Sequence, residues 1–159
     1  MINPECTEFL DALRTRDFPK AKRLCAVRDV NAACAEGGWT ALHVMVENYA
    51  VESVGFLLEN GANPNQKDDS GGTPLHLALD VEMDSFSQIE PLLADATITR
   101  PADRQPRDEV TALLLRYGAN PNAKTAKGQQ PLDFVTPSRH PRAERLLRQY
   151  GALPSSDSR

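Results

Sequence analysis

The chain lacks any long apolar run. No stretch approaches the roughly 20 consecutive apolar residues that a membrane-spanning helix requires. The start, Met1 to Cys6, also lacks the basic region and apolar core of a secretory leader. We therefore expect a soluble, cytoplasmic protein that does not associate with a membrane.

Positive charge and cysteine are also scarce. The 18 Lys and Arg residues are outnumbered by 22 Asp and Glu, which gives a net charge of -4 and an isoelectric point near 5.4. A nucleic-acid-binding domain normally has a basic balance, so we expect no nucleic acid partner. The three cysteines, Cys6, Cys25 and Cys34, are odd in number and not spaced as metal ligands. Reduced thiols are therefore expected, with Cys25 a small buried apolar residue.

Signatures of catalysis are missing as well. No Ser or Cys is accompanied by a recognisable base and orienting acid, and no glycine-rich phosphate loop precedes a helix. The three histidines have no spacing that specifies a metal site. Paired carboxylates in an acidic stretch are able to do acid–base chemistry, but Asp68 and Asp69 are expected at a solvated tip, where a carboxylate stays ordinary. The stretch comprises Asp68, Asp69, Asp80, Glu82 and Asp84. We therefore expect no enzyme, no cofactor and no metal.

A repeated phrase is the main feature that is present. Gly38 to His43 reads GWTALH, and Gly71 to His76 reads GGTPLH, 33 positions later. The phrase GANPN at 61–65 recurs at 118–122, and a third copy begins at Gly151. A fixed period of about this length is typical of stacked-repeat proteins.

Local signals predict two helices in each repeat. Thr40 and Thr73 precede apolar runs, where a hydroxyl can cap the free N–H groups that open a helix. Pro74 and Pro131 fall in the first helical turn, where a missing N–H costs nothing. The glycine of each GA pair follows the second helix, where a left-handed residue closes it. Each unit therefore reads as cap, helix, turn, helix and glycine stop.

These residues resemble the ankyrin repeat, whose unit reads approximately G-x-T-P-L-H-L-A and ends with G-A-D-V-N. The resemblance covers about residues 5–154 apart from one insertion. It implies an all-α solenoid of about four helix-turn-helix repeats with hairpin-like fingers, and a structural hydrogen-bonding role for His43 and His76. The predicted single domain, 1–154, divides into an N-terminal capping repeat (1–37), two repeats (38–70 and 71–127) and a C-terminal capping repeat (128–154), followed by a flexible tail (155–159).

The insertion lies in the third of these units. Gly61 and Gly118 are 57 positions apart instead of 33, which leaves 24 added residues, at about 83–107. Apolar spacing in Ser85 to Leu93 predicts a short helix, and the prolines and charges that follow predict an exposed loop. Two interpretations remain open: a partner-binding segment and a neutral surface loop.

The ankyrin resemblance implies that partners bind at the finger tips and along the concave face formed by the first helices. Trp39 is the first candidate, because it occupies a variable, outward-facing position and tryptophan is enriched among interface hot spots; alternatively it packs on the next finger. Tyr49 replaces the glycine expected between two helices. The candidate protein-binding residues are Glu36 and Trp39 in the first finger, Gln66, Lys67, Asp68, Asp69 and Ser70 in the second, Lys124, Lys127, Gln129 and Gln130 in the third, and Glu47, Asn48, Asp80 and Val81 on the first helices.

Charge suggests the kind of partner. Acidic residues at finger and first-helix positions predict an acidic concave surface that favours a basic protein; they are Glu47, Asp68, Asp69, Asp80 and Glu82. An arginine row, 139, 142, 145 and 148, is interpreted as a solvated outer face. We expect a monomeric, non-catalytic protein-binding module that acts as an adaptor or regulator. The alternatives are a dedicated inhibitor (immunity protein) or effector of a bacterial toxin-type system, and a ligand-binding protein or enzyme with the insertion as a lid.

Overall fold

The structure is a computed structural model that describes residues 2–87, 108–135 and 140–154. Short 3-10 helices and a two-stranded antiparallel pair accompany the α-helices. The elements are α1 (Pro4–Arg14), α2 (Phe18–Cys25), β1 (Ala33–Ala35), η1 (Glu36–Gly38), β2 (Trp39–Thr40), α3 (Ala41–Glu47), α4 (Val51–Glu59), α5 (Pro74–Ser87), α6 (Glu109–Arg116), η3 (Pro131–Phe134) and α7 (Pro141–Gln149). None of these helices is long and apolar enough to cross a membrane.

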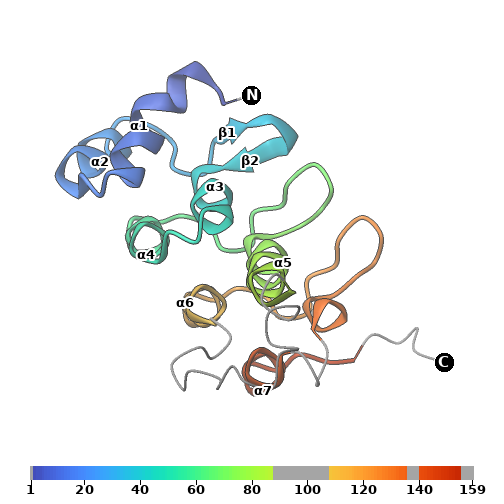
Figure 1. The fold of residues 1–159 in the computed structure, drawn as a ribbon. Coiled ribbons are helices and arrows are strands. Elements are labelled where there is room, and N and C mark those ends of the chain that lie inside the picture. The colour runs from blue at the N-terminus through green and yellow to red at the C-terminus, as the bar shows by residue number, and fades with distance from the viewer. Residues whose placement is uncertain (1, 88–107, 136–139, 155–159) are drawn as a thin grey trace.

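The helices stack in two rows (Figure 1). Within a pair, α1 contacts α2, α3 contacts α4, α5 contacts α6, and η3 contacts α7. Between pairs, α3 packs on both α1 and α5, while α6 packs on both α4 and α7. The predicted helical repeat architecture is therefore confirmed.

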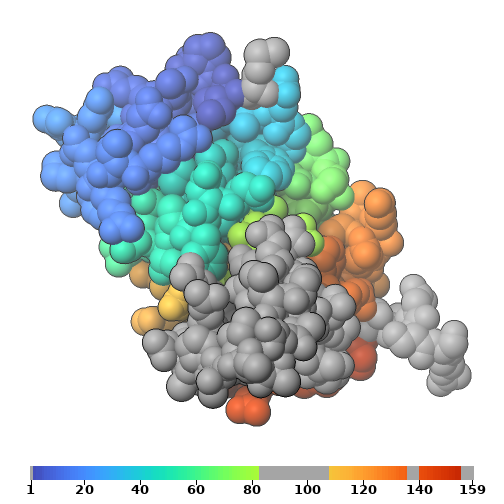
Figure 2. Space-filling view, in the orientation of Figure 1, coloured from blue at the N-terminus to red at the C-terminus, as the bar shows by residue number. Residues whose placement is uncertain are grey.

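Three fingers project from the same edge of the stack (Figure 1). We call them finger 1 (residues 33–40), finger 2 (62–73) and finger 3 (119–130). Finger 1 is the hairpin of β1 and β2, in which Ala33 pairs with Thr40 and Ala35 with Trp39. The space-filling view shows the three fingers following one another along this edge, in cyan, green and orange (Figure 2).

The predicted helix starts use a threonine and a histidine together. The His43 Nδ1 atom accepts a hydrogen bond from the Thr40 N–H at 3.3 Å and lies 3.0 Å from the Thr40 hydroxyl. Thr73 and His76 repeat this arrangement at 3.2 and 2.9 Å. Each pair satisfies a backbone N–H that would otherwise be unpaired where the helix opens.

The predicted glycine stops are also present. The backbone φ angles of Gly61, Gly118 and Gly151 are 89°, 87° and 88°, in the left-handed region that glycine adopts without steric cost. Tyr49 adopts a φ of 50° at the turn where glycine was expected. Its hydroxyl donates to Glu109 Oε2 at 2.8 Å, and this contact helps to offset the backbone cost.

A ladder of asparagines joins successive units. In each rung, the asparagine side chain donates to the carbonyl of a glycine stop in the next unit and accepts a backbone N–H two residues beyond that glycine. The rungs are Asn31 to Gly61 and Asn63, Asn65 to Gly118 and Asn120, and Asn122 to Gly151 and Leu153, with distances between 2.6 and 3.2 Å. The same pair of hydrogen bonds thus joins each unit to the next.

The core lies between the helix rows as one continuous cluster of leucines and small apolar residues. Leu42, Leu57, Leu75, Leu114 and Leu147 come from five helices and are each at most 1% exposed. Burying a leucine side chain contributes about 1.5–3 kcal/mol. Because each apolar stripe is covered by the neighbouring pair, the stack stabilises itself from unit to unit.

Two helix predictions were wrong in extent. The insertion was expected to begin near residue 83 and to contain a separate short helix from Ser85, but α5 continues without a break to Ser87. The rest of the insertion, 88–107, and the tail, 155–159, lie outside the described residues. In the last unit, η3 is a single 3-10 turn, because Val135 already has extended backbone angles.

The prediction of reduced thiols was also wrong. Cys6 and Cys34 form a disulfide across 28 positions of sequence, and Cys25 is free and only half-buried. The two partners meet because the N-terminal segment pairs with β1: Ile2 bridges Ala35, and the Asn3 N–H donates to the Cys34 carbonyl at 2.8 Å. Spacing along the chain gave no signal of this pairing.

Candidate protein-binding site

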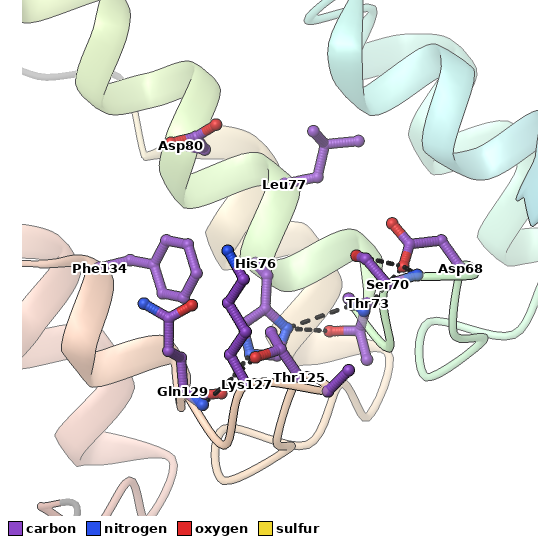
Figure 3. A pocket seen from close by; sticks show the side chains of 12 residues that line it. Asp68, Ser70, Thr73, His76, Leu77, Asp80, Thr125, Lys127, Gln129 and Phe134 are labelled. Atoms are coloured by element: carbon purple, nitrogen blue, oxygen red, sulfur yellow. Dashed lines mark hydrogen bonds between the residues drawn. The ribbon is translucent and has the colours of Figure 1, made fainter. Parts of the chain in front are cut away.

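An open groove of about 380 Å³ lies between finger 2, finger 3 and α5 (Figure 3). Finger 2 and its junction with α5 contribute Asp68, Ser70, Gly72 and Thr73; α5 contributes His76, Leu77 and Asp80; finger 3 contributes Thr125, Ala126, Lys127 and Gln129; and η3 contributes Phe134. We call this set the concave groove.

Asp68 organises the tip of finger 2. Its Oδ1 atom accepts hydrogen bonds from the Ser70 N–H, the Ser70 hydroxyl and the Gly72 N–H, all at 2.7–2.8 Å. Partial burial acts to raise the pKa of the Asp68 carboxyl, but the hydrogen bonds from Ser70 and Gly72 outweigh it and leave the pKa below its usual value. The prediction of an ordinary, solvated carboxylate was therefore wrong for Asp68.

Backbone hydrogen bonds lock the fingers to one another. The Asp69 N–H donates to the Gly37 carbonyl in finger 1 at 2.8 Å, and the Ala126 N–H of finger 3 donates to the Ser70 carbonyl at 2.9 Å. Lys67 Nζ also donates to the Lys124 carbonyl at 2.9 Å. The finger edge is therefore a continuous, preformed surface.

His76 lies behind the groove as a structural residue. It is 4% exposed, and its Nε2 atom lies 3.3 Å from the Gln129 carbonyl of finger 3. Its ring also meets the Phe134 ring edge to face, with centroids 5.3 Å apart. Burial lowers the pKa of His76, which keeps the imidazole neutral and fits the structural role implied by the sequence.

His43 has the same role one unit earlier. Burial lowers the pKa of His43 to about 4, although the Asp68 carboxylate and the Gly72 backbone oppose the shift. The Trp39 ring stacks on the His43 ring with centroids 6.2 Å apart. One face of Trp39 is thus used for packing and the side chain is half-buried, while its role in partner binding stays a prediction.

Apolar and charged side chains meet in the concave groove. Leu77 and Phe134 are half-buried, and Asp80 and Lys127 are exposed. Apolar surface with a carboxylate and an ammonium group at its border suits an extended segment of mixed character. Within the described ranges, no three His, Cys, Asp or Glu side chains gather as metal ligands would.

The structure brings five of the predicted site residues together in the groove: Asp68, Ser70, Asp80, Lys127 and Gln129. The others lie along the same faces without lining it: Glu36 and Trp39 in finger 1, Glu47 and Asn48 at the end of α3, Gln66, Lys67 and Asp69 in finger 2, Lys124 in finger 3, and Val81 on α5. Sequence reasoning missed Leu77 and Phe134. Leu77 precedes Asp80 by three residues, and this helical spacing was the available signal.

Two acidic or polar assignments need correction. Gln130 was placed on the outer surface of finger 3, but it is 8% exposed and its N–H donates to Asp133 Oδ2 at the start of η3. Glu82 was counted in the acidic concave surface, but it is 2% exposed and bonded to Thr111. Gln130 is buried because it stands where the repeat has its capping threonine. Glu82 is buried because it lies on the side of α5 that contacts Thr111 in α6.

Comparison with known proteins decides the family. The model for ankyrin repeats, in three copies, matches residues 9–100, which is more than half of the chain. The chain belongs to the ankyrin repeat family. Ankyrin repeats generally mediate protein–protein interaction, and this chain carries the fingers and concave groove of such a repeat stack.

Several ankyrin relatives resemble the chain over different lengths. Human "Protein phosphatase 1 regulatory subunit 27" is 28% identical over 135 residues, which cover 84% of this chain and 72% of that protein. A "Putative ankyrin repeat protein" of Rickettsia felis is 27% identical over 132 residues, covering 81% of this chain and 50% of its own length. Mouse "Ankyrin repeat domain-containing protein 9" is 43% identical over 68 residues, which cover 42% of this chain and 21% of that protein.

Proposed function

We propose that this ankyrin protein is a non-catalytic binding module whose concave groove holds a segment of a partner protein. The observation that carries the proposal is the position of Leu77 and Phe134 beside the exposed Asp80 and Lys127 in an open groove. Because the bordering fingers are already hydrogen-bonded to each other, little ordering is needed when the partner binds.

The charges around the concave groove favour a partner segment of mixed character. Exposed carboxylates lie in finger 1 (Glu36), in finger 2 (Asp69) and on α5 (Asp80). Finger 3 instead carries two lysines, Lys124 and Lys127. With Glu82 buried, the face is not uniformly acidic. We propose that a basic side chain of the partner lies near Asp80 and that an apolar side chain contacts Leu77 and Phe134.

A regulatory or adaptor role is the preferred biological context. Similarity to a relative whose name describes a regulatory subunit supports it. We propose further that the protein is monomeric and cytoplasmic when unbound, without a nucleic acid or membrane partner. The dedicated-inhibitor or effector role stays a prediction. The lid hypothesis also stays a prediction, since it needs a closed cavity beside residues 83–107, most of which lie outside the described residues.

A matched pair of charge reversals tests the proposal. Partners are first recovered from the native host with the tagged wild-type protein and identified by mass spectrometry. Association of a purified partner is then measured for Asp80→Lys and for Glu59→Lys. Both replaced residues are exposed, but Glu59 lies at the end of α4 in the outer helix row.

We expect Asp80→Lys to slow association about tenfold at low salt, because it reverses a charge at the border of the interface. Glu59→Lys should stay within about twofold of wild type, since it makes the same change in net charge away from the groove. Equal rates for the two variants would remove the groove from the binding site. A folded protein that retains no partner would remove the binding role itself.

A further inference from the structure

The disulfide between Cys6 and Cys34 joins two parts of the chain that are 28 positions apart in sequence. Cys6 is in the first turn of α1, and Cys34 is in β1, at the base of finger 1. Both residues are 1% exposed. Together with the hydrogen bond from Asn3 to the Cys34 carbonyl, the bond fastens finger 1 to the N-terminal helix.

A guanidinium group is held directly against the two sulfur atoms. Arg28 Nη2 lies 2.7 Å from Cys6 Sγ and 3.7 Å from Cys34 Sγ. Arg28 Nη1 donates to the Glu5 carbonyl at 2.9 Å, and the guanidinium carbon lies 5.0 Å from the centre of the Phe9 ring. Arg28 Nε is buried and has no hydrogen-bond partner within the described part of the chain. The cation is therefore positioned by the backbone, an aromatic face and the sulfur pair.

Arg28 interacts more strongly with a thiolate at this position than with the disulfide. A thiolate accepts a strong charge-assisted hydrogen bond from a guanidinium group, whereas a disulfide sulfur is only a weak acceptor. Cys6 also lies near the N-terminus of an 11-residue helix, where negative charge is stabilised. A disulfide whose reduced form is stabilised in this way is more easily reduced, as expected for a regulatory bond.

We propose that Cys6 and Cys34 form a reversible redox pair, with Arg28 as its positioning residue, that exchanges with a low-molecular-weight thiol of the glutathione class. The redox pair acts whatever the binding partner is, and Arg28 stabilises its reduced state.

The exchange proceeds in two balanced steps. Because Cys34 is buried, the first step requires a local opening of finger 1. A glutathione thiolate then attacks Cys34 Sγ, the Cys6–Cys34 bond breaks, and Cys6 leaves as a thiolate beside Arg28. A second glutathione thiolate then attacks the mixed disulfide, releasing Cys34 and oxidised glutathione. In total, two electrons pass from the two glutathione thiolates to the protein. The Cys34 thiolate takes up a proton from solvent, and the Cys6 thiolate does the same when it is protonated. Oxidised glutathione reverses both steps.

Finger 1 is the element that responds. Glu36 and Trp39 follow Cys34 within the same hairpin, so breaking the disulfide removes the covalent tie between this finger and α1 and leaves only the hydrogen-bonded contacts of Ile2 and Asn3. Trp39 is the only tryptophan of the chain, and its fluorescence therefore reports on finger 1 alone. The hydrogen bond from Asp69 to the Gly37 carbonyl carries the change to finger 2.

The test uses the full chain with Cys25→Ser, because Cys25 is a free, half-buried thiol that would otherwise compete. Samples are equilibrated with glutathione buffers of increasing oxidised fraction. The disulfide is quantified by alkylation and mass spectrometry, and Trp39 fluorescence is recorded in parallel. We expect both signals to follow the same reversible transition.

Substitution of Arg28 distinguishes a redox role from a structural one. Arg28→Gln should shift the equilibrium about tenfold toward the disulfide, because the thiolate loses a charge-assisted hydrogen bond. Arg28→Lys should lie between wild type and Arg28→Gln. Arg23→Gln, which changes an exposed arginine of α2, should stay within about twofold of wild type.

Several results would overturn the proposal. One is a disulfide that persists at all glutathione ratios, or that never forms at any of them. Another is a thiol–disulfide equilibrium constant that is the same in Arg28→Gln and Arg23→Gln. If circular dichroism shows that Arg28→Gln is unfolded, Arg28→Lys decides the matter in its place. A folded Arg28→Lys protein with a wild-type equilibrium would likewise contradict the role of Arg28.

Discussion

Replacing Glu82 by glutamine tests whether one buried carboxyl group makes the protein less stable as the pH rises. Glu82 Oε2 lies 2.8 Å from Thr111 Oγ1, and the Thr111 N–H donates to Oε1 at 3.3 Å. Burial raises the pKa of Glu82 to about 8, and the nearby Asp108 carboxylate adds to the shift, although the hydrogen bonds from Thr111 and the Val110 backbone oppose it.

The sign and size of the effect follow from these pKa values. In the unfolded chain the Glu82 carboxyl titrates near 4.5, whereas in the folded protein it titrates near 8. Between these values the folded protein retains a proton that the unfolded chain has released, so the free energy of unfolding falls as pH rises. At about 1.36 kcal/mol per pKa unit, the loss at pH 8 is on the order of 4 kcal/mol.

Urea unfolding at about pH 5 and pH 8 measures this loss. Glutamine stays neutral and can keep both bonds, with its amide donating to Thr111 Oγ1 and its carbonyl accepting the Thr111 N–H. Glu82→Gln should therefore lie within about 1 kcal/mol of wild type near pH 5, where little of the loss has occurred, and exceed it by several kcal/mol at pH 8. The histidines whose pKa values burial lowers affect both proteins equally. Exposed Glu59→Gln serves as the control, and parallel wild-type and Glu82→Gln curves would refute the reasoning.

Two further predictions concern packing between units. An added Cβ at Gly71 would lie 2.7 Å from the Ala126 backbone nitrogen, whereas at Gly61 it would meet nothing within 4 Å. Both glycines have positive φ, so alanine has a similar backbone cost at each position. The additional clash means that Gly71→Ala should lower the free energy of unfolding by roughly 1 kcal/mol or more beyond the effect of Gly61→Ala. Equal shifts of the two variants in thermal unfolding would contradict this. Ser53→Ala should cost about 1 kcal/mol in urea unfolding, because the Ser53 hydroxyl donates to the buried Leu13 carbonyl at 2.7 Å. An unchanged midpoint would argue against this link between α4 and α1.

The elements that the sequence predicted well are those with local causes. Thr40 and Thr73 open their helices with a histidine three residues later, and the glycines of the GA pairs close them with left-handed backbone angles. The elements that were predicted wrongly depend on distant contacts. The extent of α5 and the shortness of η3 had no signal in the local sequence, and the Cys6–Cys34 bond depends on the approach of segments 28 positions apart.

The candidate site shows the same division. Period and resemblance were sufficient to nominate Asp80, Lys127 and Gln129, which line the concave groove. Leu77 and Phe134 were missed because apolar residues in a helical stripe are normally assigned to the core. Residues of similar polarity can have opposite exposure, since the neighbouring unit covers one side of each helix and leaves the other open.

The sequence by itself determined the repeat period, the family and those helix ends that threonine, proline and glycine mark, because capping, proline and glycine preferences act within a few residues of the chain. Only the tertiary structure decided that Asp80 is exposed while Glu82 is buried, and that Cys6 meets Cys34 beneath Arg28. These outcomes depend on which unit covers which face and on the approach of segments far apart in sequence, so no local pattern encodes them.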